Sequence, residues 1–190
     1  MSGAEAQDFS AQRARLVTEV DAMYAETRAE TGLAAMAPRV RAALGKVERH
    51  RMVPPDQVSL AYRNHPLPIG HGQTISQPYI VALSADLIAP QPDHVVLEVG
   101  TGSGYQAAVL AEIVKQVYTI EIVEALGREA GVRLAALGYR NVEVRIGDGY
   151  KGWPEKAPFD GIVVTAAAPR VPQALVGQLK PGGRMVVPVG

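Results

Sequence analysis

Residues 94–105 read HVVLEVGTGSGY, and this stretch decides how the rest of the 190-residue sequence is interpreted. Residues 94–99 form a short apolar run, which is typical of a strand buried on both faces of a sheet. Residues 100–104 place glycine at alternate positions, where the backbone can turn tightly and approach a ligand closely. With a helix expected over residues 105–114, the stretch predicts a strand, a glycine loop and a helix in succession.

The sequence after this unit continues the alternation of strand and helix. Apolar runs predict further strands over residues 116–122, 141–146, 159–164 and 183–189. Helices are expected over residues 123–137 and 171–179. Strands that alternate with helices indicate right-handed crossovers. The predicted fold class is therefore α/β, with a doubly wound, mainly parallel sheet covered on both faces.

The sequence before this unit has a different character. Apolar residues recur at helical spacing over residues 9–33 and again after Pro38, whereas residues 1–8 predict no regular element. Residues 51–75 contain prolines and glycines that break regular elements. We expect a packed loop there that helps to form a site, because compact domains rarely carry long loops without a function.

A helix expected over residues 76–89 joins the two parts of the chain. Ser76 is its predicted N-cap, and Ile80 is expected to face inward. We therefore divide one compact unit into two sections. Residues 1–75 supply N-terminal helices and a substrate-side loop, and residues 76–190 supply a cofactor-binding core.

Composition narrows the function classes. Lys and Arg total 19 and Asp and Glu total 19, so the net charge is zero with His neutral, which argues against nucleic-acid binding through bulk positive charge. The absence of cysteine excludes disulfides, Cys-ligated metals and a catalytic thiol. No stretch approaches the length of a membrane span, and the start has no signal-peptide core. We expect a cytoplasmic protein with no membrane contact.

Two groups of basic side chains were candidates for a further role. His65 and His71 lack a carboxylate partner at metal-ligand spacing, so no metal site is predicted. A cluster of arginines is interpreted as a solvated helix face, with attraction of peptide carboxylates as the alternative. It comprises Arg39, Arg41, Arg49 and Arg51.

Three acids stand at the ends of the predicted strands, around the glycine loop. Glu121, at the end of the second strand, can accept from both hydroxyls of a ribose, and Asp148, after the third, can accept from an adenine amino group. Glu98 precedes the first glycine by two residues, where it suits the cationic end of a ligand and opposes a pyrophosphate. The loop has no Lys or Arg to neutralise phosphate. These features favour S-adenosylmethionine over NAD as the cofactor.

Three segments of the sequence carry a resemblance to a known family. They are LPIGHGQTISQPY at 67–79, VLEVGTGSGY at 96–105 and FDGIVVTAA at 159–167. Together they closely resemble the protein-L-isoaspartate (D-aspartate) O-methyltransferase family. The resemblance implies the class I S-adenosylmethionine-dependent methyltransferase fold with an N-terminal helical cap. It also implies methylation of the free carboxylate of L-isoaspartyl and D-aspartyl residues in damaged proteins and peptides, which starts repair through a succinimide. We expect a monomer.

The resemblance also implies which residues form the site. Ser76 matches the active-site serine of the family. The residues expected to hold the cofactor, including the three acids above, are Gln77, Pro78, Glu98, Gly100, Thr101, Gly102, Ser103, Gly104, Glu121, Ile122, Asp148 and Gly149. Those expected to face the substrate are Thr74, Ile75, Thr165, Ala166 and Ala167.

The family pattern extends further than this sequence. Family members usually continue past the position of Gly190 through antiparallel strands that help to close the active site. We expect the present fold to lack these strands, which would leave residues 183–189 as an edge strand.

The chemistry expected of this site needs no general base. The free acid of an isoaspartyl residue is an α-carboxyl, whose ordinary pKa of about 3.3–3.7 leaves it ionised at neutral pH. We expect Ser76 to donate a hydrogen bond that orients this carboxylate, with backbone amides near Ala166 and Ala167 assisting.

Three other functions stay open on the sequence alone. A methyltransferase of the same fold could act on a small molecule or a nucleic acid, although residues 165–168 lack the Asn/Asp-Pro-Pro-aromatic loop typical of enzymes that methylate base amino groups. A non-catalytic relative could bind S-adenosylmethionine, or a partner, without turnover. An NAD-linked oxidoreductase is disfavoured, because no acid–base pair for hydride transfer is visible.

Overall fold

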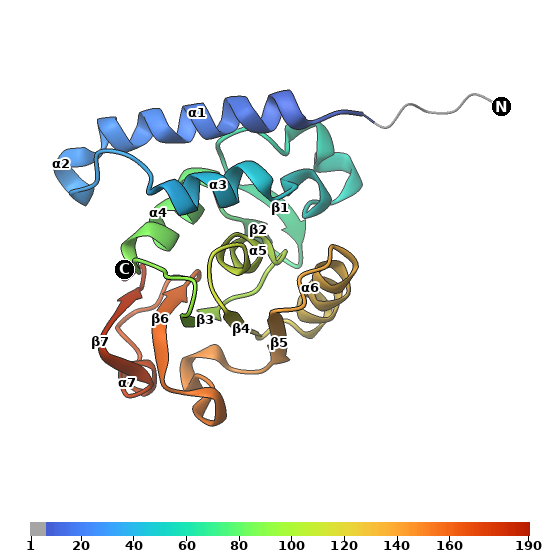
Figure 1. Cartoon of the computed structure of the whole chain (residues 1–190). Coiled ribbons are helices and arrows are strands. Elements are labelled where there is room, and N and C mark those ends of the chain that lie inside the picture. The colour runs from blue at the N-terminus through green and yellow to red at the C-terminus, as the bar shows by residue number, and fades with distance from the viewer. Residues whose placement is uncertain (1–6) are drawn as a thin grey trace.

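The computed structural model of the chain describes residues 7–190, and its centre is a five-stranded sheet (Figure 1). The strands are β3 (Val95–Val99), β4 (Gln116–Glu121), β5 (Val142–Ile146), β6 (Phe159–Val164) and β7 (Leu179–Val186). Neighbouring strands pair in parallel, in the order β5-β4-β3-β6-β7. The chain runs from β3 outward to β5 and then returns to the other side of β3, which creates a topological switch point. The predicted doubly wound parallel sheet is confirmed.

Helices connect the strands much as the sequence predicts. They are α4 (Pro78–Leu87), α5 (Tyr105–Ala111), α6 (Glu124–Ala136) and α7 (Gln173–Val176). The single-turn elements η3 (Gly149–Lys151) and η4 (Pro154–Lys156) lie between β5 and β6. The helix expected over residues 171–179 is shorter than predicted, because β7 begins at Leu179 rather than at residue 183.

Apolar side chains cover both faces of the sheet, which explains why β3 is apolar at every position except Glu98. Val96 belongs to a buried cluster that includes residues of α4 and α5. Leu97 and Val99 belong to a second cluster, with Trp153 and Phe159. Successive side chains of a strand point to opposite faces, so a strand between two clusters is apolar on both faces. Glu98, near the carboxyl end of β3, is the exception.

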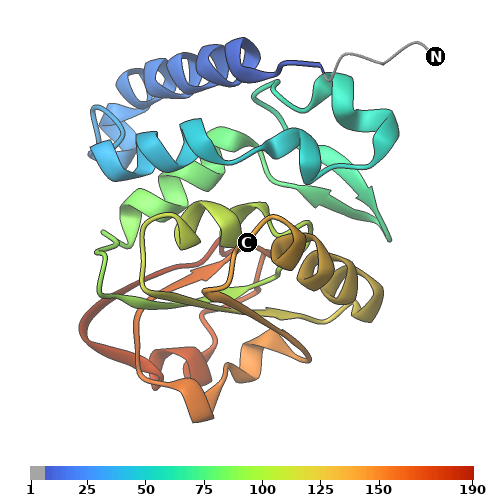
Figure 2. The ribbon, with the colours of Figure 1, turned by 45° about the vertical axis from the view of Figure 1, so that its right-hand side comes forward.

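Three N-terminal helices form an outer layer over α4 and α5 (Figure 2). They are α1 (Ser10–Glu26), α2 (Arg28–Thr31) and α3 (Pro38–Lys46). The helical region predicted over residues 9–33 is thus confirmed as two helices. Gly32, with a left-handed φ of 75°, ends the second of them.

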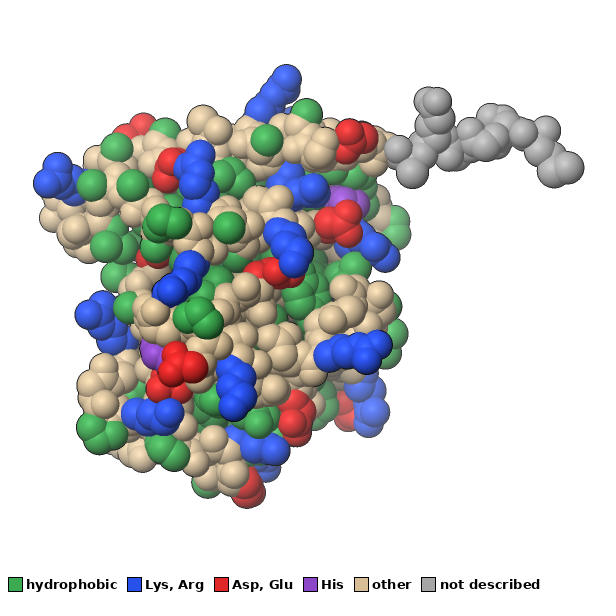
Figure 3. All heavy atoms as spheres, viewed as in Figure 1, with side chains coloured by type: hydrophobic (Ala, Val, Ile, Leu, Met, Phe, Trp, Pro, Cys, Tyr) green, Lys and Arg blue, Asp and Glu red, His purple; other side chains and the backbone are tan. Residues whose placement is uncertain are grey.

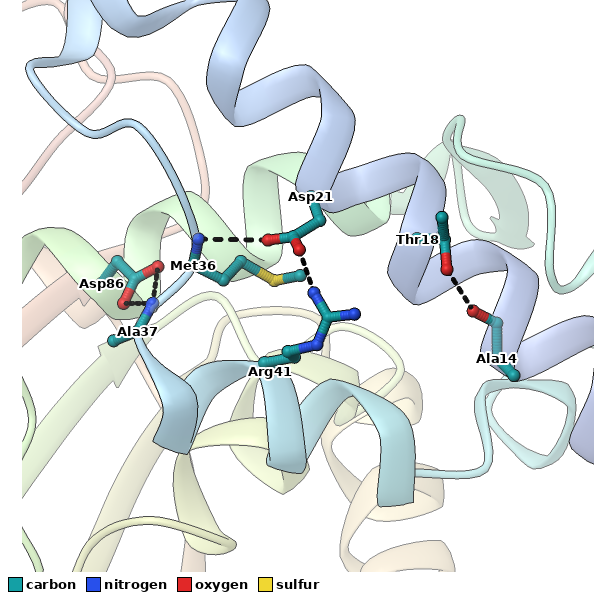
Figure 4. Close-up of polar contacts among 7 residues, drawn as sticks. All are labelled: Ala14, Thr18, Asp21, Met36, Ala37, Arg41 and Asp86. Carbon is teal, nitrogen blue, oxygen red and sulfur yellow. Dashed lines mark hydrogen bonds and ion pairs between the residues drawn. The ribbon is translucent and has the colours of Figure 1, made fainter.

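Polar contacts hold the outer layer together and fix it to α4, and Figure 4 shows the contact of Asp86 with Ala37 and those of Asp21. Asp86 of α4 accepts a hydrogen bond from the hydroxyl of Tyr24 in α1 at 2.7 Å and one from the backbone N–H of Ala37 at 3.3 Å. Asp21 of α1 pairs with Arg41 of α3. Burial raises the pKa of the Asp86 carboxyl, although both hydrogen bonds oppose that rise.

Residues 51–75 are packed as expected, with Leu67, Ile69 and Ile75 buried, but the expectation that prolines and glycines prevent regular elements there is wrong. The single-turn element η1 (Arg49–Arg51) ends at the start of this region, which contains the six-residue 3-10 helix η2 (Pro55–Leu60) and an antiparallel hairpin of β1 (Leu67–Gly70) and β2 (Gln73–Ile75). The glycines that suggested irregular structure form the hairpin turn, in which Gly70, His71 and Gly72 all have positive φ. Pro68 is tolerated because a two-stranded sheet has only edge strands.

The helix after the hairpin begins later than predicted. Pro78 is the first residue of α4, a position where its missing N–H costs no hydrogen bond. Gln77 is the N-cap, without a side-chain capping bond, so the predicted capping role of Ser76 is wrong. Ile80 is 44% exposed rather than inward, and Val81 and Ala85 face the core instead.

Charged side chains of both signs lie interspersed on the face of the molecule shown in Figure 3. The arginine cluster is only partly solvated as predicted: Arg39, Arg41 and Arg51 are exposed, but Arg49 is fully buried. Within residues 7–190, no helix is long and apolar enough to cross a membrane. The prediction for residues 1–6 lies outside the described residues, and the division at residue 75 stays a prediction.

Candidate active site

A cavity of about 350 Å³ lies beyond the carboxyl ends of β3, β4, β5 and β6. Its wall on one side is formed by the glycine loop and the strand ends, and on the other by residues 73–76 at the end of the hairpin. This is the place where doubly wound sheets bind ligands, because loops on opposite sides of the switch point separate there.

The glycine loop is held in a shape that only glycine accepts at its first position. Gly100 has a φ of 99°, and a Cβ atom there would lie 2.3 Å from Oγ1 of Thr165. The Thr165 hydroxyl lies 2.7 Å from the carbonyl oxygen of Gly100 and 3.0 Å from that of Val99, to which it can donate. The loop after β6 is therefore packed directly against the loop after β3.

Glu121, at the end of β4, holds the glycine loop through a hydrogen bond to its backbone. Its carboxylate accepts hydrogen bonds from the backbone N–H groups of Gly102 at 2.7 Å and Val123 at 2.9 Å. A carboxylate offers about four lone-pair sites. Glu121 thus has the capacity to accept from two further donors, as its predicted contact with two ribose hydroxyls requires.

Glu98 is the least satisfied polar side chain of the cavity. It is fully buried, and neither carboxylate oxygen has a hydrogen-bond partner among the described residues. Burial, together with the charge of Glu121, raises the pKa of the Glu98 carboxyl well above its ordinary value. A buried, partnerless acid fits a ligand that brings a cationic group, because the ligand would supply the missing donors. The cationic amino-acid end of S-adenosylmethionine meets this requirement.

Asp148 and Tyr150 link the loops after β5 and β6. Oδ1 of Asp148 accepts from the backbone N–H of Tyr150 at 3.0 Å, and the Tyr150 hydroxyl donates to the carbonyl of Ala167 at 3.1 Å. Gly149 lies between them, and a Cβ atom there would meet Val99 at 2.4 Å. This corner of the cavity is lined by Asp148, Gly149 and Tyr150.

Ser76 lies on the opposite wall, directly after the hairpin. Its carbonyl accepts a hydrogen bond from Nη1 of Arg49 at 2.9 Å. Thr74 and Ile75 line the same wall, and Thr165 and Ala166 lie at the end of β6. The residues expected to face the substrate and those expected to hold the cofactor therefore meet around one cavity.

Most of the predicted site residues line this cavity. They are Thr74, Ile75, Ser76, Glu98, Gly100, Thr101, Gly102, Ser103, Glu121, Ile122, Asp148, Gly149, Thr165 and Ala166. Four others lie outside its lining, namely Gln77, Pro78, Gly104 and Ala167. The Gln77 amide donates instead to the carbonyl of Asn64 at 3.0 Å, and Gly104 faces the side chain of Leu134. The roles of all these residues stay predictions.

Several lining residues were not singled out from the sequence. They are Gln73, Val81, Val99, Tyr105, Gln106, Ile120, Val123 and Tyr150. Tyr105 and Gln106 start α5, so their position directly after the glycine loop could have indicated them. Nothing in the sequence near Tyr150 indicates its contact with Ala167. Among residues 7–190, no group of three or more His, Asp or Glu side chains could hold a metal ion.

Comparison with known proteins bears on the identity of this site. The family model described as protein-L-isoaspartate (D-aspartate) O-methyltransferase matches residues 20–190. A protein-L-isoaspartate O-methyltransferase 2 of Polaromonas sp. (strain JS666) is 62% identical over 175 residues, which cover 92% of this chain and 83% of that protein. A protein of the same name from Syntrophobacter fumaroxidans is 56% identical over 188 residues, which cover 99% of this chain and 76% of the relative.

Solved structures agree with this assignment. A protein-L-isoaspartate O-methyltransferase superposes with a TM-score of 0.81 and 29% identity, over 93% of this chain and 55% of its own. A Plasmodium falciparum protein in complex with S-adenosyl-L-homocysteine superposes with a TM-score of 0.75 over 97% of this chain and 85% of its own, and at 21% identity this likeness shows the fold alone. The fold is that of the class I methyltransferases. Because the family model matches residues 20–190 and a relative is 62% identical over 92% of this chain, the chain belongs to the protein-L-isoaspartate (D-aspartate) O-methyltransferase family.

Proposed function

We propose that this protein transfers a methyl group from S-adenosylmethionine to the free carboxylate of L-isoaspartyl and D-aspartyl residues in damaged proteins and peptides. The adjacent peptide nitrogen then attacks the methyl ester and methanol leaves, which gives a succinimide and starts repair. One observation carries the proposal: a single cavity is lined on one side by the glycine loop and its acids and on the other by the hairpin end with Ser76.

The cofactor side of the cavity has the donor and acceptor groups that the cofactor needs. Glu98 would pair with its cationic amino group, Glu121 would accept from the ribose hydroxyls, and Asp148 would accept from the adenine amino group. Backbone N–H groups of the glycine loop add donors at the start of α5. When bound, S-adenosylmethionine supplies an electrophilic methyl group attached to a positively charged sulfur.

The wall with Ser76, which we call the acceptor side or acceptor wall because it would bind the group that accepts the methyl, has to orient a carboxylate rather than activate it. The α-carboxylate of an isoaspartyl residue is already ionised at neutral pH, because its ordinary pKa is about 3.3–3.7. Ser76 would donate a hydrogen bond to one oxygen and fix the direction of the other, with the backbone near Ala166 assisting. Such alignment of two reactants can lower a barrier by up to roughly 7–11 kcal/mol.

Matched peptides test the proposal directly. Transfer of a radiolabelled methyl group is measured to two peptides that differ only in an aspartyl or an isoaspartyl linkage. We expect label on the isoaspartyl peptide alone. Equal labelling of both peptides, or none with either, contradicts the proposal. Binding of S-adenosylhomocysteine without any transfer would instead favour the non-catalytic alternative.

The proposal includes a monomer that acts in the cytoplasm without a nucleic-acid or membrane partner. A net charge of zero supports this view, because nucleic-acid binders depend on clustered positive charge. Sedimentation at several protein concentrations tests the oligomeric state. A mass that rises with concentration would contradict the monomer.

A further inference from the structure

Arg49 is a buried cation that the sequence gives no reason to expect. It lies in the turn η1, and its exposed fraction is 0%, the same as for the central leucines of the core. Arg51, two residues later in the same turn, is exposed and pairs with Glu48 at 3.5 Å. Charged residues are rarely buried without a partner, so the position of Arg49 calls for an explanation.

The guanidinium of Arg49 holds both ends of the hairpin segment. Nη1 donates to the carbonyl of Ser76 at 2.9 Å, and Nη2 donates to the carbonyl of His65 at 3.2 Å. His65 precedes β1 and Ser76 follows β2, so one planar side chain spans the base of the hairpin. Arg49 therefore holds the backbone of Ser76 in place.

The same guanidinium connects this wall to the cofactor side. Its Cζ atom lies 4.8 Å from the ring centroid of Tyr105, which is a cation–π distance. Tyr105 is the first residue of α5 and lines the cavity. Arg49 thus sits behind two residues of the cavity wall, Ser76 and Tyr105, without lining the cavity itself.

No anion of the described chain compensates the charge of Arg49. None of the ion pairs among residues 7–190 includes it, and its Nε has no hydrogen-bond partner. Burial lowers its pKa, yet arginine stays protonated in proteins at neutral pH. The cavity is consequently polarised, with the acids Glu98 and Glu121 on the cofactor side and a buried cation behind the acceptor side.

We propose that Arg49 is a positioning residue for the acceptor: it fixes Ser76 and places a permanent positive charge behind the acceptor wall, so that the site selects an ionised carboxylate over a neutral group of the same shape. This inference rests on the proposed function, because it assumes that the acceptor is the isoaspartyl carboxylate. Charge acts at a distance in a poorly solvated site, which is why Arg49 need not touch the acceptor.

Binding of two peptides to the protein saturated with S-adenosylhomocysteine tests the inference. One peptide contains isoaspartate, and the other contains isoasparagine, which replaces the free carboxylate by a neutral carboxamide of similar shape. The variants are R49M, which removes the charge and the hydrogen bonds, R49K, which keeps the charge, and the matched control R51M.

The preference for the charged peptide is the decisive measurement. We expect this preference to fall about tenfold in R49M, the order of magnitude of the attraction between two unit charges that do not touch in a partly desolvated site, while the affinity for the isoasparaginyl peptide changes little. R51M should keep the preference of the wild type. R49K should keep most of the preference but lose turnover, because lysine lacks the planar fork that reaches two carbonyls.

If R49M lost affinity for both peptides by the same factor, the inference would be overturned, because Arg49 would then have a purely structural role. Should R49M fail to fold, R49K still decides: a folded R49K without the charge preference also overturns the inference. The wild type could transfer methyl groups to the isoaspartyl peptide while R49M keeps the full binding preference for that peptide. This pair of results would contradict the role of Arg49 and leave the proposed function intact. A wild-type protein that binds neither peptide contradicts the proposed function itself.

Discussion

The two walls of the cavity are built in different ways. The cofactor wall consists of strand ends and the loops that directly follow them: Glu98 and Glu121 lie at the carboxyl ends of β3 and β4, and Gly100 directly follows β3. The acceptor wall consists of a hairpin end whose position depends on Arg49, which is 27 residues from Ser76 and 16 from His65 in the chain. One wall is set by local sequence, and the other by contacts between distant parts of the chain.

Substitutions in the two walls should therefore affect different properties. A change in the cofactor wall disturbs backbone geometry that the sheet imposes, and should affect cofactor affinity first. A change in the acceptor wall alters contacts that the sheet does not control, and should affect peptide binding or turnover while the cofactor still binds.

The largest effect is expected for Gly100→Ala. The added Cβ would lie 2.3 Å from Oγ1 of Thr165, and alanine in a left-handed conformation costs about 1–2 kcal/mol before any clash. We expect cofactor affinity to fall by about two orders of magnitude, since strain and the clash both displace the loop. Calorimetric titration with S-adenosylhomocysteine measures this. Gly147→Ala is the matched control, because nothing lies within 4 Å of its Cβ position and its φ is not positive. Equal losses in both variants would contradict the special role of the loop.

Glu98→Gln should change cofactor affinity and stability in opposite directions. Removal of the buried acid should weaken cofactor binding roughly ten- to a hundredfold, the range for a hydrogen bond to a charged group. The variant without cofactor should be more stable than the wild type by about 0.5–2 kcal/mol at neutral pH, because it buries no ionisable group. A variant that loses both affinity and stability would contradict this expectation.

The pH dependence of Glu98 has a definite sign. Burial raises the pKa of this carboxyl well above its ordinary value of 4.5, so the folded state keeps a proton that the unfolded chain releases. The free energy of unfolding of the cofactor-free protein should therefore fall as the pH rises above 4.5 toward the folded-state pKa. Urea titrations at several pH values measure this slope, and in Glu98→Gln the slope should be smaller. An unchanged slope would mean that another group is responsible.

Ser76→Ala should lower turnover without changing cofactor affinity or stability. We expect kcat/KM for an isoaspartyl peptide to fall by roughly tenfold, as the loss of one donor to a charged acceptor implies. Affinity for S-adenosylhomocysteine and the unfolding midpoint should stay at the wild-type values, because Ser76 neither caps α4 nor belongs to the glycine loop. Wild-type turnover in a correctly folded variant would remove Ser76 from the proposed site.

The smallest effect is expected away from both walls. Tyr24→Phe removes the hydrogen bond to Asp86 and should lower the free energy of unfolding by about 1 kcal/mol, with kcat/KM unchanged. The control Arg128→Ala removes an exposed ion pair with Glu124 and should cost less than about 0.5 kcal/mol. If Tyr24→Phe lowered turnover, the outer helical layer would have to be coupled to the cavity.

The cofactor wall could be predicted from the sequence because its signals are local. Parallel strands place their carboxyl ends at one edge of the sheet, so the strand runs that located Glu98, Glu121 and Asp148 also brought them together. The order of helices and strands followed from the same runs. The capping role of Ser76 was wrong because Pro78 fixes the start of α4 two residues later.

The acceptor wall could not be predicted from the sequence, because it depends on contacts between residues that are far apart in the chain. Residues 67–75 look irregular by composition, and their hairpin depends on a turn with three consecutive left-handed residues. Arg49 and Arg51 occupy equivalent places in the segment RHR, and nothing nearby in the sequence indicates that only the first is buried. Burial of Arg49 is decided by carbonyls 16 and 27 residues away.

The contact between Thr165 and Gly100 has a consequence for how the protein is made. The two residues are 65 positions apart, and so are the backbone N–H of Val95 and the carboxylate of Asp160 that caps it. A nascent chain emerging from the ribosome exposes the glycine loop long before β6 is synthesised. Pairings between such distant segments are slow to form, because the entropy of closing the intervening loop must be overcome first. The segment that is most recognisable in the sequence should thus be among the last to become rigid, and recognition of the methyl donor should begin only after Thr165 has left the exit tunnel.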